Sequence, residues 1–129
     1  AAISANASWP RPRCTMTRHD DRARLADMLD HAREALEMAA GRERADLDGD
    51  RQFRYALTHL VEIVGEAAAH VSDASRRRHT QIPWTGIVGV RNRLVHGYSD
   101  VDLDVLWRIV QDDLPALIPQ LENALKEGA

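Results

Sequence analysis

The sequence predicts an all-α domain, an up-and-down bundle of four main helices with one additional short helix. Three observations support this prediction. Only 5% of the residues are aromatic, and Ala, Leu and Val supply most of the apolar share, a balance that favours helices over a sheet. Apolar residues recur every three or four positions along most of the chain. With 129 residues, the chain is long enough for one domain with a sizeable core.

The first predicted helix is capped by Thr17 or Asp20 and runs to about Gly41. Its apolar residues share the spacing of a single buried face: Leu25, Met28, Leu29, Ala32, Leu36 and Ala39. The acidic segment 46–50 that follows is predicted to be a polar connection. It is not expected to bind calcium, because it lacks the glutamate at the twelfth position and the full ligand rhythm.

The second predicted helix covers about 51–71, with an inner stripe at the same spacing: Phe53, Leu57, Leu60, Val61, Val64, Ala67, Ala68 and Val71. Segment 72–75 can cap a short helical turn that carries three consecutive arginines. A third main helix can begin near Pro83, because a proline in the first turn loses no hydrogen bond. It is predicted to reach Gly97, so that His96 lies at a helix C-terminus.

The last predicted helix is capped by Asp100 or Asp102 and places its leucines inward. Two prolines, Pro115 and Pro119, interrupt it, which predicts a kink or two abutting helices. The sequence contains no β-hairpin signal and no run of apolar residues long enough for a transmembrane span.

Residues 1–15 differ from the rest, because they have no helical period and contain two prolines near their end. They also lack the apolar core of a signal peptide. We expect a disordered or non-native tail with Met16 as the natural start, and one domain over 16–129. A single cysteine, Cys14, cannot form an internal disulfide, which fits a cytoplasmic location.

The net charge of −3 is unevenly distributed along the chain. Counting Arg, Lys, Asp and Glu gives −2 for residues 1–50, +4 for 51–98 and −5 for 99–129. A locally positive segment can attract phosphate even when the whole protein is acidic. The alternative is that the helices simply differ in solvated surface charge.

The most informative segment is 91–98, with the sequence Arg-Asn-Arg-Leu-Val-His-Gly-Tyr. Arg91 offers a fork of donors suited to phosphate oxygens, and His96 can move protons near neutral pH. On a straight helix, these two side chains would lie about 140° apart around the axis. They can share a site if the helix unwinds near Gly97, or if two copies meet across a two-fold axis.

The pattern Arg-x4-His-x-Tyr, with its Ile-Pro-Trp and Asp-Leu-Pro flanks, resembles the signature of HEPN ribonucleases. The order of motifs over about 17–125 is most similar to the HepT toxins of bacterial toxin–antitoxin systems. The resemblance implies metal-independent cleavage of cellular RNA, with tRNA the expected target, by a homodimer whose cleft lies between protomers. His96 would act as general base or acid, Arg91 would stabilise the transition state, and Asn92 would orient the phosphate or the imidazole.

The resemblance also implies that Tyr98 is AMPylated by a partner nucleotidyltransferase, the MNT antitoxin, with ATP and magnesium as its reactants. The added nucleotide would place negative charge two residues from His96 and exclude the RNA phosphate. The alternative is a tyrosine packed on the bundle, with its hydroxyl bonded to a carbonyl.

Two further groups of residues are candidates for the site. Glu66 lies among small apolar residues, so we expect partial burial and a role in orienting the site through Arg91 or Arg93; a structural salt bridge is equally open. Four arginines are candidates for contacting the RNA backbone, the first three with a solvated polar turn as the alternative: Arg76, Arg77, Arg78 and Arg93.

No cofactor or metal is expected, because the histidines show no zinc-binding spacing. A second possible function is a non-catalytic HEPN-like helical module that binds a nucleotide or a partner nucleotidyltransferase. The complete Arg-x4-His-x-Tyr motif argues against it, since a scaffold does not need all three residues. A third is a DNA-binding antitoxin or regulator, which the pI of about 6.1 and the lack of a helix-turn-helix signature disfavour.

Overall fold

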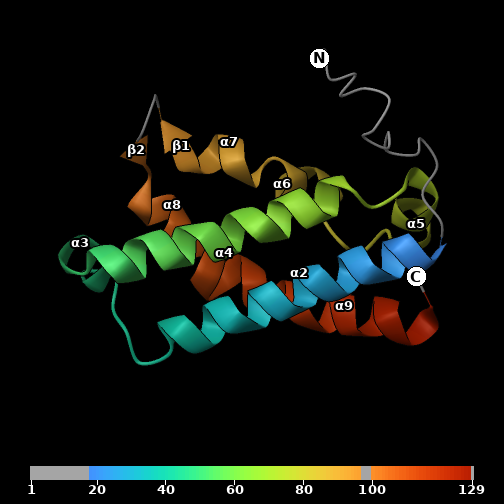
Figure 1. Ribbon diagram of the computed structural model, residues 1–129, viewed down its shortest axis with the longest axis horizontal. Helices are drawn as coiled ribbons and strands as arrows, with labels where there is room; N and C mark the ends of the chain where they lie inside the picture. The colour runs from blue at the N-terminus through green and yellow to red at the C-terminus, as the bar shows by residue number, and fades with distance from the viewer. Residues whose placement is uncertain (1–17, 97–99, 129) are drawn as a thin grey trace, which may run out of the picture.

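The computed structural model describes residues 18–96 and 100–128, and over this part of the chain it is an all-α bundle with one very short hairpin (Figure 1). The all-α prediction is therefore confirmed. The elements, in chain order, are α2 (Arg18–Ala39), α3 (Asp46–Gly49), α4 (Arg51–Ala69), α5 (Asp73–Arg78), α6 (Trp84–Val88), α7 (Val90–Leu94), β1 (Val95–His96), β2 (Asp100–Val101), α8 (Leu103–Arg108), the π-helical turn η1 (Ile109–Asp113) and α9 (Leu114–Glu127). The expected N-terminal tail lies outside the described residues.

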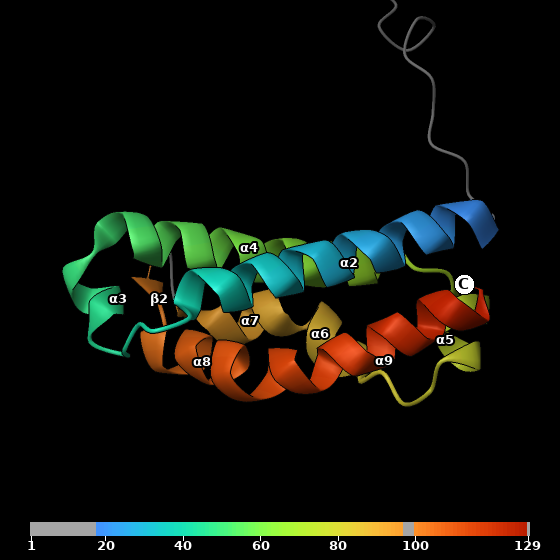
Figure 2. The same cartoon turned by 90° about the horizontal axis from the view of Figure 1, so that it is seen from below.

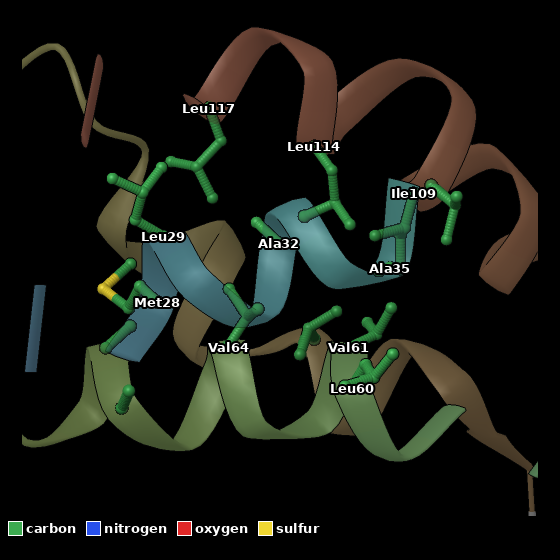
Figure 3. Close-up of a cluster of buried hydrophobic side chains, with 14 of the residues drawn as sticks. Met28, Leu29, Ala32, Ala35, Leu60, Val61, Val64, Ile109, Leu114 and Leu117 are labelled. Carbon is green, nitrogen blue, oxygen red and sulfur yellow. The ribbon is translucent and has the colours of Figure 1, made fainter. Parts of the chain in front are cut away.

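The long helices α2, α4 and α9 lie side by side, and α2 packs against both of the others. Figure 2 shows α2 and α4 along one side of the bundle, with α8 and α9 following one another along the other. The buried faces meet around α2, whose residues Met28, Leu29, Ala32 and Ala35 lie between α4 and the η1–α9 segment (Figure 3). The predicted stripes of α2 and α4 are confirmed with one exception: Ala35 is fully buried, whereas Leu36 is only partly buried. Of the residues predicted to face inward in the last helix, Leu103 and Leu125 are only partly buried.

Polar side chains cap the helices largely as predicted. Gly41 has a φ of +75° just past the end of α2, the left-handed conformation that glycine adopts without strain. Ser72 accepts a hydrogen bond from the Ser75 amide at the start of α5, and Asp102 accepts from two amides at the start of α8. Segment 46–50 differs from the prediction, because part of it forms the one-turn helix α3. The physical reason is Leu47, which is fully buried and holds the turn against the bundle.

The cap of α4 gives the fold a pH-dependent component. Hydrogen bonds from the Phe53 amide and from Arg42 lower the pKa of Asp50 below its ordinary value of 3.8. Its stabilisation is fully present above the unfolded pKa and is lost as the pH falls through the lowered folded pKa. Asp50→Asn keeps a capping oxygen without the charge. We expect the urea midpoint of Asp50→Asn to lie below that of wild type, with the largest difference near neutral pH and a smaller difference below about pH 4. Urea titrations at several pH values measure this, and a pH-independent deficit would contradict it.

The prediction of a third helix that reaches Gly97 is wrong in both the length and the end of the helix. Gly89 divides it into α6 and α7, and α7 ends at Leu94, before the motif histidine. The chain then forms an antiparallel hairpin that the sequence did not indicate, with Val95 opposite Val101 and His96 opposite Asp100. The amide of Asp102 donates to the Leu94 carbonyl oxygen at 2.6 Å. This oxygen therefore bonds an amide eight residues further along the chain, in place of the amide that a further helical turn would supply.

The prediction of an interrupted last helix is confirmed near Pro115 and wrong at Pro119. Two α-helical segments, α8 and α9, are joined by the π-helical turn η1, which ends two residues before Pro115. Proline has no amide hydrogen to donate to the preceding turn, and a π turn accommodates the resulting break. Pro119 lies inside α9 without ending it. None of the described helices combines the length and the hydropathy that a membrane span requires.

Candidate active site

The motif residues lie at one end of the bundle, on α7 and on the strand that follows it (Figure 1). Arg91 and Asn92 are in α7, and His96 is in β1, with its Cα opposite that of Asp100. The helix ends between the arginine and the histidine, so the 140° separation of a straight helix does not apply. The sequence left two ways for these residues to share a site, unwinding of the helix or a two-fold axis. The helix does end early, at Leu94 and thus before Gly97.

The Arg91 and Asn92 side chains are both exposed. Neither forms a hydrogen bond or an ion pair with another residue in the described ranges 18–96 and 100–128. Arg93 is also exposed, but its guanidinium lies 3.5 Å from a carboxylate oxygen of Asp113. Both members of that pair are about half exposed, so the pair contributes little to stability. Arg91 and Asn92 thus present polar groups that a ligand from solvent can reach.

A close approach between α4 and the α6–α7 segment positions the motif. Val90 and Leu94 are buried on the inner side of α7. A Cβ added to Gly65 on α4 would lie 2.6 Å from Val90 Cγ1 and 3.0 Å from the Ile87 carbonyl oxygen, so only glycine fits there. Sequence reasoning missed Gly65. The available signal was a glycine in the middle of an apolar helical stripe. Glycine destabilises a helix, so its presence there indicates close packing against a neighbouring element.

The expectation of a partly buried Glu66 is wrong, because this side chain is exposed. Gly65 is the residue that faces α6 and α7, and the next residue is turned by about 100° around the helix. In the described part of the chain, Glu66 makes no ion pair with Arg91 or Arg93. The small residues around it are explained by close packing of helices and not by a buried carboxylate.

The three arginines of α5 are not brought to the motif. Figure 1 shows α5 and the hairpin at opposite ends of the bundle. Arg76 donates to the carbonyl oxygens of Ala68 and Ala69 at 3.0 and 3.2 Å and therefore caps the end of α4. Arg77 and Arg78 are exposed. Only an RNA that extends along the bundle would reach them from the motif.

A mostly apolar cavity of about 500 Å³ lies between α4, α6–α7 and the η1–α9 segment. Its lining includes Val61, Ile87 and Leu117, and also the Arg93–Asp113 pair. Such a lining suits packing against apolar groups better than binding of a phosphate. Although this cavity is large, its apolar lining argues against a reaction site for RNA. The exposed face of α7 is the better candidate.

A family model described as "Ribonuclease HepT-like" matches residues 28–124, from within α2 to within α9. The chain belongs to the HepT-like ribonuclease family. The matched span contains the whole Arg-x4-His-x-Tyr motif. Family membership confirms the resemblance inferred from the sequence. It also supports ribonuclease activity, with RNA as the substrate.

Individual relatives of this HepT-like chain agree with the family match. It is 32% identical over 107 residues to "Putative RNase MJ1380" of Methanocaldococcus jannaschii, covering 83% of this chain and 98% of the relative. It is 33% identical over 104 residues to "Probable ribonuclease HepT" of Thermococcus cleftensis, covering 78% and 94%. A Caldanaerobacter subterraneus protein, "Putative RNase TTE0752", is 27% identical over 103 residues, covering 80% and 92%. No solved structure matches the chain significantly.

Residues 97–99 of the HepT-like chain lie outside the described residues, and they include the expected modification site Tyr98. The described frame is α7 and β1 before these residues and β2 after them. In this frame, Arg91 is on a helix anchored to α4, and the backbone of His96 is held by pairing with Asp100. The two residues therefore belong to different elements that meet at Leu94.

Proposed function

We propose that this chain is the toxin of a toxin–antitoxin pair, a metal-independent endoribonuclease that cleaves cellular RNA, with tRNA the expected target. A homodimer in the cytoplasm is the active form, and AMPylation of Tyr98 by an MNT-type nucleotidyltransferase neutralises it. One observation carries the ribonuclease assignment. In a member of the HepT-like family, Arg91 and Asn92 are exposed and lack partners among the described residues, on a helix that leads directly into the His96 strand.

The chemistry needs only a guanidinium, an imidazole, water and the RNA itself. The ribose 2′-oxygen attacks the adjacent phosphorus and the bond to the 5′-oxygen breaks, which leaves a 2′,3′-cyclic phosphate and a 5′-hydroxyl. His96 takes the proton from the 2′-hydroxyl or gives one to the leaving oxygen, and water carries out the other proton transfer. Arg91 binds the non-bridging oxygens through its guanidinium as negative charge builds up on them. Asn92 orients the phosphate or the imidazole.

Dimerisation supplies what one copy lacks. In one copy the Arg91 and Asn92 side chains are exposed to solvent, whereas a cleft between two copies would strengthen electrostatic interactions by excluding water. A two-fold axis beside α7 would bring segment 91–96 of one copy close to the same segment of the other copy. The exposure of α7 and of its motif residues is compatible with this arrangement.

RNA cleavage by the purified, unmodified protein tests the proposal. Incubation with tRNA in the presence of a chelator is expected to give fragments with 2′,3′-cyclic phosphate and 5′-hydroxyl ends, identified by end-group analysis. Loss of the reaction on chelation would contradict metal independence. Absence of cleavage, together with normal growth on expression, would favour the non-catalytic nucleotide- or nucleotidyltransferase-binding module instead.

AMPylation is a separate prediction. Incubation with the partner nucleotidyltransferase, ATP and magnesium is expected to add one or more adenylates and to stop RNA cleavage, because the new charge lies beside His96. Intact-mass spectrometry measures the addition, and Tyr98→Phe is expected to abolish it. The chain contains two tyrosines, so Tyr55→Phe is the matched control and should be labelled like wild type. Full labelling of Tyr98→Phe would rule out this modification site.

A further inference from the structure

A second surface feature lies beside the hairpin, on the side of α4. It is a hollow of about 290 Å³ lined by Arg54, Tyr55, Thr58, Asp100, Val101 and Leu103. Its walls therefore come from the first half of α4, from β2 and from the start of α8. This volume is at the lower end of the range for ligand pockets, about 300–1,000 Å³, which suits a single ring system better than a longer stretch of polymer.

The hollow contains an exposed aromatic side chain with an arginine stacked on it. Tyr55 is 63% exposed, and it is one of two large hydrophobic side chains that are exposed in the described ranges 18–96 and 100–128. The Arg54 guanidinium carbon lies over the Tyr55 ring, 5.3 Å from its centroid. Arg54 is itself held by donating to the Leu47 carbonyl at 3.1 Å. The pair is therefore positioned before any ligand arrives, and the bundle does not need the exposed ring for its core.

The hairpin places this hollow close to the motif histidine. Asp100, which lines the hollow, is the Cα partner of His96 across the two strands. Neighbouring strands are only about 5 Å apart. A nucleotide whose phosphate lies at His96 would thus have its neighbouring base within reach of Tyr55.

We infer that Tyr55, supported by Arg54, is a stacking subsite for an unpaired base next to the scissile phosphate. This inference rests on the proposed RNA cleavage. Single-stranded RNA is commonly bound by aromatic rings and arginine planes, because every base has a π face. The exposed Asp100 carboxylate can accept a hydrogen bond from the amino group of a base. The hollow is therefore assigned to the base and not to the backbone.

The test compares cleavage of a short single-stranded RNA by the full chain carrying different residues at position 55. Tyr55→Ala is expected to raise KM and lower kcat/KM about 5- to 100-fold, because stacking is lost while His96 and Arg91 remain. Tyr55→Trp, which keeps a stacking plane, should stay close to wild type. Val88→Ala removes the other exposed large hydrophobic side chain and should change nothing. An abasic substitution at the neighbouring nucleotide should impair wild type and leave Tyr55→Ala unaffected.

The outcomes separate this inference from the proposed function. If wild type cleaves RNA and Tyr55→Ala has the same KM and kcat, the stacking subsite is wrong while the ribonuclease stands. If Tyr55→Ala shifts the protein from dimer to monomer in size-exclusion chromatography, the ring belongs to an interface between copies and the inference is again overturned. If wild type cleaves no RNA, both the proposed function and the subsite are rejected.

Discussion

His96→Ala is expected to slow RNA cleavage by the purified protein about 10²–10⁴-fold, the usual contribution of a positioned general acid or base. Arg91→Ala is expected to slow it about 10²–10³-fold, because the charge that develops on the phosphoryl oxygens loses its counter-charge. Arg91→Ala should not alter folding, since the Arg91 side chain is exposed. Single-turnover cleavage of the same RNA measures both effects.

Matched variants distinguish a reaction site from a general loss of charge. His70→Ala and Arg33→Ala replace an exposed histidine and an exposed arginine on other parts of the surface. Within the described ranges, Arg33 pairs with the half-exposed Glu122, an interaction that contributes little. Both controls should cleave RNA like wild type. Equal activity of His96→Ala, Arg91→Ala and wild type would remove the basis for assigning the reaction to this motif.

Gly65→Ala is expected to impair cleavage more than it impairs folding. The added methyl group would lie 2.6 Å from Val90 Cγ1 and 3.0 Å from the Ile87 carbonyl oxygen, so α6 and α7 must move away from α4. Overpacking of this kind costs about 1–3 kcal/mol, offset in part by about 1 kcal/mol of helix propensity gained when alanine replaces glycine. A shift of about 1 Å at Arg91 can lower the rate about 10²-fold. Urea denaturation and single-turnover kinetics measure the two effects.

Two further variants make the Gly65 prediction specific. Val90→Ala removes the nearest contacting atom, so the double variant Gly65→Ala/Val90→Ala is expected to recover part of the lost activity. Gly86→Ala is the control in the neighbouring helix, because nothing lies within 4 Å of its added Cβ. It should be neutral or slightly stabilising. If Gly65→Ala cleaves RNA as fast as wild type, the close approach does not position the motif.

Much of the fold was predictable because its signals are local. The apolar spacing identified the faces of the long helices. Caps were predicted within segment 72–75 and at Asp100 or Asp102, and the structure has Ser72 and Asp102 there, bonded to amides only two or three residues away. Pro115 similarly marked the break that the structure contains as η1. The motif residues and the family were also accessible, since they depend on residue type and order.

Other features depended on contacts between distant parts of the chain. The end of α7 is set by the Asp102 amide, which reaches back to the Leu94 carbonyl, and no local pattern around Leu94 announces that bond. Glu66 was predicted to be partly buried and paired because its neighbours are small. Those small neighbours instead allow α6 and α7 to pack closely against α4 at Gly65. Arg76 seemed available for RNA, but it caps the end of α4.

By itself, the sequence determined the helical class, the inner faces of the long helices, most caps and the residues able to perform phosphoryl chemistry, because each depends on residue type at short spacing. Only the tertiary structure decided that Arg91 and His96 belong to different elements and that Tyr55 and Arg54 lie beside the hairpin. These relations arise when helices pack and strands pair across many residues. Their energies come from surfaces and backbone groups that meet only in the folded chain.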